Sequence, residues 1–304
     1  MKVICENLPC DRRACVATIG VFDGIHLGHR KIFARVRQES KIFRVDSLVI
    51  TFDLPPRVIL KQHFPGCITS FEEKKRLIES EGIDRVWFLK SRSALLRLSG
   101  REFLRFVQRY VQLKVLVVGE DFRFGFGGRC SVVDLKFLAR EFGFKLVVLK
   151  KKKQNQKVLS SSLAREFIRR GDFASAGKLL GRGYEFSGKV CRGRGNGEKL
   201  GFPTANVDVS GHVIPPPGVY AARVRSGGKK YLAAVNIGVR PTLLRSGRVV
   251  LESHLLGFRG NLRGRTISVE FLKRIRGEKK FSSRKVLRQA ISRDVEYIRH
   301  VFSF

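Results

Sequence analysis

Short apolar runs alternate with helical patterns over the first half of the chain. The runs that we predict to be strands span residues 16–22, 47–52, 85–89, 114–119 and 145–149. Two of the intervening segments begin with Ser70 before Glu73 and with Ser99 before Glu102, which is the spacing of a helix capping box. Strands that alternate with helices are typical of a parallel sheet covered by helices, so we predict an α/β fold for this half.

After residue 182 the apolar residues follow a period of two, and glycine and proline turns separate the segments. We predict strands over residues 220–225, 230–236, 249–256 and 266–272, and a closing helix over residues 282–299. Gly227 and Gly228 separate the first two of these strands, which is a strong hairpin signal. The pattern predicts a small antiparallel β-barrel with a terminal helix. Because Gly181 and Gly183 can bend the chain, we expect one domain over residues 1–182 and a second over residues 183–304.

The segment GVFDGIHLGHR, residues 20–30, lies between the first predicted strand and an amphipathic helix. Its glycines, Gly20, Gly24 and Gly28, allow the backbone to come close to a ligand, and a helix that begins near Gly28 offers unpaired N–H groups to an anion. His26 and His29 lie one turn apart and could donate hydrogen bonds to a triphosphate. A pair of solvated histidines is the alternative, but the preceding strand and the glycines favour a phosphate site.

Two motifs carry a resemblance to known enzymes. HLGH, residues 26–29, resembles the HxGH signature of the nucleotidylyltransferase superfamily, whereas LGFPTAN, residues 200–206, and AVNIGVRPT, residues 234–242, resemble riboflavin kinase. Their order in one chain resembles the bacterial bifunctional riboflavin kinase and FAD synthetase family. Further segments share this likeness, namely residues 119–125, 160–165, 179–182, 216–220 and 251–255. The resemblance implies a Rossmann-like nucleotidylyltransferase domain (α/β, with a parallel sheet) followed by a β-barrel kinase domain.

For the downstream half the resemblance implies that riboflavin and ATP give FMN. The Thr204 hydroxyl and the Asn206 amide oxygen would hold magnesium, which prefers hard oxygen ligands, and Glu252 would accept the proton of the ribityl hydroxyl. The residues expected to bind ATP here are Gly193, Gly195, Gly197, Lys199, Thr204 and Asn206. Without the resemblance, Thr204 and Asn206 could merely cap a turn and Glu252 could be an exposed strand residue. Asn196 and Glu198 replace the arginines that are common in relatives, and this replacement could alter how the loop binds ATP.

For the upstream half the resemblance implies transfer of AMP from ATP to FMN, which gives FAD and pyrophosphate. The residues expected to bind ATP are Gly20, Phe22, Asp23, Gly24, His26, Gly28, His29, Asp121, Ser161, Ser162 and Arg165. His26, His29 and Arg165 are the catalytic candidates, with Arg165 as counter-charge for the leaving pyrophosphate. The alternative reading of Arg165 is one more cation on a basic helix. Pro55 stands where relatives usually have a histidine and Leu163 replaces a frequent arginine, so a kinase with a weak or degenerate adenylyltransferase is the first alternative function.

The composition limits the remaining classes of protein. The chain has 304 residues, a hydrophobic content of 43% and a formal net charge of +35. That charge raises a second alternative, a basic protein that binds nucleic acid, but the basic residues are scattered and no recognition motif accompanies them. The six cysteines form no CxxC pair, and no apolar stretch approaches the roughly 20 residues that span a bilayer. We therefore expect a cytoplasmic enzyme with small-molecule partners, ATP, riboflavin and FMN, no membrane partner and at most weak self-association.

Overall fold

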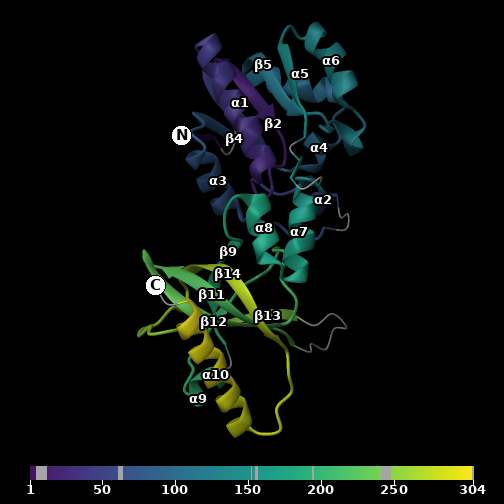
Figure 1. Cartoon of the computed structure of the whole chain (residues 1–304). Coiled ribbons are helices and arrows are strands. Elements are labelled where there is room, and N and C mark those ends of the chain that lie inside the picture. Colours follow the sequence, from purple (N-terminus) through teal and green to yellow (C-terminus); the bar gives the residue numbers. More distant parts are fainter. Residues whose placement is uncertain are drawn as a thin grey trace. The chain divides into compact units, whose positions relative to one another are not determined.

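The computed structural model describes residues 1–4, 12–60, 64–151, 153–154, 157–193, 195–240 and 248–302. Its internal contacts divide the chain into two compact units. The first comprises Met1–Cys67 and Phe71–Ser161, and the second comprises Ile68–Ser70 and Ser162–Phe304. Each unit is described by itself below (Figure 1).

The first unit contains a six-stranded sheet in which every strand pair is parallel, with the strand order β1-β4-β3-β2-β5-β6. The strands are β1 (Lys2–Ile4), β2 (Ala14–Ile19), β3 (Asp46–Phe52), β4 (Arg85–Leu89), β5 (Gln112–Gly119) and β6 (Lys145–Leu149). The five predicted strands and the parallel sheet are therefore confirmed, except that the first strand ends at Ile19 and not at residue 22, because the chain turns there and Phe22 has a positive φ. The edge strand β1 was not predicted, because three residues are too few to show a period.

Helices cover both faces of this sheet, as Figure 1 shows for α1, α5 and α6. The helical elements are α1 (Leu27–Phe43), α2 (Pro56–Ile59), α3 (Phe71–Ser80), α4 (Ser93–Leu96), α5 (Gly100–Tyr110), the 3-10 turn η1 (Phe126–Gly128) and α6 (Val132–Glu141), and β7 (Lys153–Gln154) pairs with β8 (Lys157–Val158) as a short hairpin. Phe33 of α1 and Ile78 of α3 belong to one core cluster, whereas Leu104 of α5 and Leu135 of α6 belong to the other. Strands that are buried on both faces read as continuous apolar runs, which explains the pattern in the sequence.

The strand order creates a switch point beside β2. The chain passes from β2 through α1 to β3 on one side, whereas β5 joins β2 on its other side. Open α/β sheets bind ligands at the carboxyl ends of the strands where the order reverses. The segment 20–30 follows β2 and Asp121 follows β5, so the fold brings both to this switch point.

The second unit contains a closed antiparallel barrel with the strand order β10-β13-β12-β11-β14-β9. Its elements are α7 (Ser161–Arg170), which begins at the last residue of the first unit, α8 (Phe173–Leu180), β9 (Glu185–Cys191), α9 (Asn196–Lys199), β10 (Ala205–Val207), β11 (Gly218–Ser226), β12 (Lys229–Arg240), β13 (Arg248–Leu255), β14 (Thr266–Gly277) and α10 (Arg284–Phe302). The predicted barrel, hairpin and terminal helix are confirmed. Ser226 pairs with Lys229, and both Gly227 and Gly228 have positive φ, at 54° and 80°, as the tight hairpin turn requires.

Helix α8 packs against the barrel through an aromatic cluster. The ring of Phe173 lies 5.2 Å from that of Phe271 and 5.7 Å from that of Tyr220. Both buried tyrosine hydroxyls have acceptors, because Tyr184 donates to the Val213 carbonyl and Tyr220 donates to the Pro216 carbonyl. Phe173 lies before residue 183, the predicted start of the second domain, and yet belongs to the aromatic core of the barrel. The boundary between residues 182 and 183 stays a prediction.

Candidate active sites of the two units

The turn after β2 has an unusual backbone. Phe22, Gly24 and Ile25 all have positive φ, at 46°, 80° and 38°. For the two residues with side chains this conformation costs on the order of 1 to 3 kcal/mol each, and such strain clusters at functional sites. A Cβ at Gly20 would lie 2.8 Å from the Phe22 ring, so the glycine makes room for that ring. The ring is buried and packs edge-on against His29 at 5.2 Å, so in this structure Phe22 positions His29.

His26 caps helix α1. Its Nδ1 accepts hydrogen bonds from the backbone N–H groups of Gly28, at 3.1 Å, and His29, at 3.3 Å. The expectation that these N–H groups are unpaired is therefore wrong, because the imidazole occupies them. Accepting at Nδ1 leaves the proton of a neutral ring on Nε2, so the ring donates from Nε2. A Cβ at Gly28 would lie 2.9 Å from the His26 ring, so this glycine allows the cap to form.

His29 stacks on His26, with ring centroids 3.6 Å apart and an interplanar angle of 22°. Its Nδ1 is buried and hydrogen-bonds to none of the residues that the structure describes. Burial lowers the pKa of His29 well below its ordinary value, and repulsion by the protonated form of His26 and by the Lys74 ammonium lowers that pKa further. The imidazole therefore stays neutral around pH 7, which suits a hydrogen-bond donor more than a fixed cation.

Two charged side chains are buried beside this turn. Asp23 and Lys74 are each only 3% exposed, and the Lys74 ammonium donates to the carbonyl of Phe52, at the end of β3, over 3.1 Å. Burial lowers the pKa of Lys74, whereas the negative charges of Asp23 and Asp53 act in the opposite direction. Lys74 was missed in the sequence, because in the charged segment FEEKKRLIES it resembles a solvated helix residue.

The remaining candidates of the upstream half are more dispersed. Ser161 donates to the Asp23 carbonyl over 2.8 Å, so this serine contacts the turn after β2, whereas its binding of ATP stays a prediction. The carboxylate of Asp121 is 64% exposed and pairs with Lys151 at 3.1 Å. Ser162 and Arg165 lie on α7 and belong to the second unit. That they close over the phosphates stays a prediction.

In the barrel, strand register brings the kinase candidates together. Asn206 of β10 pairs directly with Glu252 of β13, and residues directly opposite on neighbouring strands have Cβ atoms about 4.5 to 5.5 Å apart. Their neighbours Ala205 and Leu251 are buried in the barrel, so Asn206 and Glu252 face outward. Thr204 precedes Asn206 by two residues and therefore lies on the same face.

The glycine-rich segment before α9 closes onto these side chains. A Cβ at Gly193 would lie 2.0 Å from the Asn206 amide nitrogen, and one at Gly197 would lie 3.0 Å from the Thr204 hydroxyl and 2.4 Å from the Phe202 carbonyl. Gly195 has a φ of 71° and begins α9. Lys199 ends this short helix and is exposed. Only glycine lets the backbone approach Asn206 and Thr204 this closely.

Two further residues adjoin this face and were given no role from the sequence. Asn236 of β12 pairs with Glu252 from the side opposite Asn206. His254 follows two residues after Glu252, and its Nδ1 lies 2.9 Å from the Pro203 carbonyl. Both residues lie within motifs that resemble riboflavin kinase, at residues 234–242 and 251–255, so the sequence did hold a signal for their role. Pro241 and Thr242, the end of the second kinase motif, lie outside the described residues.

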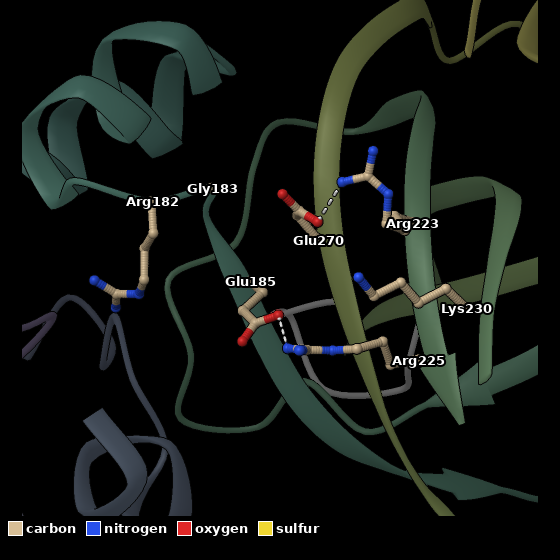
Figure 2. A pocket seen from close by; sticks show the side chains of 7 residues that line it. All are labelled: Arg182, Gly183, Glu185, Arg223, Arg225, Lys230 and Glu270. Carbon is tan, nitrogen blue, oxygen red and sulfur yellow. Dashed lines mark hydrogen bonds and ion pairs between the residues drawn. The ribbon is translucent and has the colours of Figure 1, made fainter. Parts of the chain in front are cut away.

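The second unit also has a surface pocket of about 210 Å³ elsewhere on the barrel. None of the predicted site residues lines it; the lining residues are Arg182, Gly183, Glu185, Arg223, Arg225, Lys230 and Glu270 (Figure 2). Arg223 forms an ion pair with Glu270 at 2.8 Å, and Arg225 forms one with Glu185. Four cationic side chains and two carboxylates line the pocket, so its polar surface carries a net positive charge, and it shares no residue with the Asn206 and Glu252 pair.

The donor sets of the two sites decide what metal they could hold. Within the part of the chain that the structure describes, no three His, Cys, Asp or Glu side chains form a metal-binding group. Thr204 and Asn206 offer two neutral oxygens beside a glycine-lined backbone. Magnesium keeps several waters and binds through few protein ligands together with substrate phosphates, so this pair fits Mg²⁺ as part of a nucleotide complex.

Comparison with known proteins identifies the family of each half of the chain. Residues 8–163 match the family model of FAD synthetase and residues 180–302 match that of riboflavin kinase. The chain is 36% identical over 295 residues to the bifunctional riboflavin kinase/FMN adenylyltransferase of Pseudomonas fluorescens, covering 95% of this chain and 94% of the relative. It is 34% identical to the enzyme of that name from Escherichia coli K12, over 96% of this chain and 94% of the relative. The chain belongs to this bifunctional family.

The predicted function and enzyme class are confirmed by this membership. The protein is a transferase that phosphorylates riboflavin to FMN and adenylylates FMN to FAD, with ATP as the second substrate of both reactions. A crystal structure described as a macrolide-efflux protein from Streptococcus pneumoniae also resembles the whole chain. Its TM-score is 0.84 and its sequence identity 27%, and the match covers 98% of this chain and 99% of that one. Among the described residues, no helix is long and apolar enough to cross a membrane.

Proposed function

We propose that phosphoryl transfer takes place on the outward face of β10 and β13, and that adenylyl transfer takes place at the turn after β2. The observation that carries this division is the pairing of Asn206 with Glu252 under the glycine-rich segment, in a unit separate from the one that holds His26 and His29. Each of the two reactions then has its own ATP site.

In the kinase, Thr204 and Asn206 would hold Mg²⁺ together with ATP, and the ion supplies positive charge that offsets the charge of the transferring phosphoryl group. Glu252 accepts the proton of the ribityl hydroxyl as the hydroxyl oxygen bonds to the γ-phosphorus. The bond to the β,γ-bridging oxygen breaks and ADP leaves. The backbone of the glycine-rich segment and Lys199 would bind the phosphates. His254 holds the Phe202–Pro203 turn that leads to Thr204.

In the adenylyltransferase, an oxygen of the FMN phosphate attacks the α-phosphorus of ATP and pyrophosphate leaves. The reaction needs no covalent enzyme intermediate, so alignment and charge stabilisation suffice. His26 donates from Nε2 and His29 remains neutral and donates beside it. Arg165 serves as counter-charge for pyrophosphate, and Asp121 lies near the nucleotide or its metal. Gly20, Gly24 and Gly28 let the backbone approach the phosphates. Ser161 and Ser162 would bind the phosphates through their hydroxyl groups.

One assay tests this proposal. Purified protein is incubated with riboflavin, ATP and magnesium, and the flavins are separated over time. We expect FMN to form first and FAD to follow, and chelation of magnesium to stop FMN formation. A second reaction that starts from FMN isolates adenylyl transfer. FMN formation that persists without any divalent cation would contradict the role of Thr204 and Asn206, and absence of FAD would favour the degenerate alternative.

We also propose a cytoplasmic location and at most weak self-association. The described cysteines Cys15, Cys67, Cys130 and Cys191 are free thiols, which suits a reducing compartment, and ATP is abundant there. Val133 and Phe137, one turn apart on α6, are 62% and 66% exposed and offer apolar surface to a second copy. Light scattering over a concentration series tests the self-association, and a stable oligomer that persists on dilution would contradict it.

A further inference from the structure

Lys74 is a buried cation at the edge of the sheet where the first unit carries its candidate site. The residue belongs to α3, whose neighbouring residues Glu72 and Lys75 are more exposed, and only 3% of it is accessible. A buried ammonium group is costly unless hydrogen bonds and opposite charges surround it, so a buried lysine beside a candidate site is a candidate for a functional role. The known family motifs quoted above do not include it.

The surroundings of Lys74 connect two loops. Its ammonium donates to the Phe52 carbonyl at 3.1 Å, and the Asp53 carboxylate that follows accepts from the Ser91 N–H at 2.9 Å. These bonds fix the start of the loop that contains Pro55. The negative charges that act on Lys74 include Asp23, which is itself buried in the turn after β2. Strands β2 and β3 are adjacent and parallel, so the loops that follow their carboxyl ends lie at the same edge of the sheet, and Lys74 acts on both loops.

We propose that Lys74 is a positioning residue for adenylyl transfer, which holds the loop after β3 and the His26–His29 turn in one arrangement through its ammonium group. This rests on the proposed assignment of adenylyl transfer to that turn. The charge has a second effect, because Lys74 and His26 are the charged or titratable groups that act on His29 and help to keep it neutral. Removal of the ammonium group therefore changes both the geometry and the proton affinity of His29.

The test replaces Lys74 by Met, which keeps the length and apolar stem, and by Gln, which keeps a donor but loses the charge. Lys75→Met is the matched control, since it makes the same substitution one residue along the same helix. Riboflavin phosphorylation by each variant monitors the rest of the chain. We expect Lys74→Met to lower kcat for FAD formation about 10- to 100-fold, the usual cost of a misplaced reacting group, with a smaller effect on KM. Lys74→Gln should recover part of this loss.

The pH profile separates positioning from mere packing. Loss of the Lys74 charge raises the pKa of His29, so in both Lys74 variants the acidic limb of kcat/KM for FAD formation should move to higher pH. The control should leave the rate and the limb unchanged. FAD formation within twofold of the wild type, or a fall in kinase activity in the same proportion, would overturn the proposal. Loss of activity in His29→Ala with full activity in Lys74→Met would leave the site assignment standing and reject only the role of Lys74.

Discussion

The two proposed sites differ in how the chain assembles the residues that bind the ATP phosphates. In the first unit one turn of ten or so residues carries the histidines, and its geometry depends on residues with positive φ and on buried charges. In the barrel the corresponding residues come from three separate segments, 193–197, 204–206 and 252, which strand register and close backbone approach bring together. The comparison indicates that the first site is sensitive to local strain and buried charge, whereas the second is sensitive to register and to added volume.

The strongest test of this division is Glu252→Gln. The substitution keeps the size of the side chain but removes the proton acceptor, and loss of a general base costs about 10² to 10⁴ in rate. We expect FMN formation to fall by that factor and FAD formation from supplied FMN to stay within twofold. Initial rates of both reactions on one preparation measure it. An equal loss of both activities would show that the two sites are not separate.

His29→Ala makes the reverse test in the turn. The variant removes a buried imidazole that stacks on His26 and contacts Phe22, so both donor and packing are lost. We expect FAD formation to fall by about 100-fold, as for one preorganised hydrogen-bond donor, whereas FMN formation persists. Rates from FMN and from riboflavin are compared with the wild type. A proportional fall in riboflavin phosphorylation would mean that the histidine is structural, or that the kinase needs the upstream fold.

Gly193→Ala sharpens the other half of the comparison. The new methyl group would meet the Asn206 amide at 2.0 Å, so Asn206 or the segment must shift. We expect FMN formation to fall by about tenfold with a higher KM for ATP, since a displaced ligand costs roughly that much or more. Gly277→Ala, where the nearest side-chain atom lies 3.8 Å away, is the control and should retain its activity. Unchanged kinetics in Gly193→Ala would show that close approach to Asn206 is not required.

The sequence predicted most of the fold because its signals were local. Five of the six strands of the parallel sheet, the Gly227–Gly228 hairpin and the Ser99–Glu102 capping box each have their pattern within a few residues. The short strands β1 and β10 have three residues each and owe their existence to their neighbours in the sheet. Motif residues of both sites could be named for the same reason. The burial of Lys74 could not be predicted, because it depends on contacts of α3 with the loops after β2 and β3, and these segments are far apart in sequence.

The histidine cap of α1 is another feature that the sequence did not predict, and it bears on Pro55. Both residues occupy the N-cap position of a helix with an extended ψ, 169° at His26 and 131° at Pro55. His26 uses its ring to cap the helix, whereas Pro55 makes no side-chain capping bond. Pro55 itself is extended, but the expectation that both prolines hold this turn extended is wrong, because Pro56 begins helix α2, where a proline ring suits the first helical position; neither ring offers a donor or acceptor.

Pro55→His therefore gives the smallest predicted effect and the finest test of the turn. If relatives use this histidine to bind ATP, its return should speed FAD formation a few-fold, which is roughly the worth of one exposed hydrogen bond. Phosphorylation of riboflavin should not change, and in the wild type FMN should accumulate before FAD. The variant also gives the loop more conformational freedom, because it removes one of two successive prolines, and this opposes the gain. Initial rates of both reactions, measured side by side for the two proteins, decide the sign. An unchanged or slower FAD rate would mean that Lys74 and Ser91 already hold this loop in its working arrangement, and that the substitution of proline for histidine is neutral in this chain.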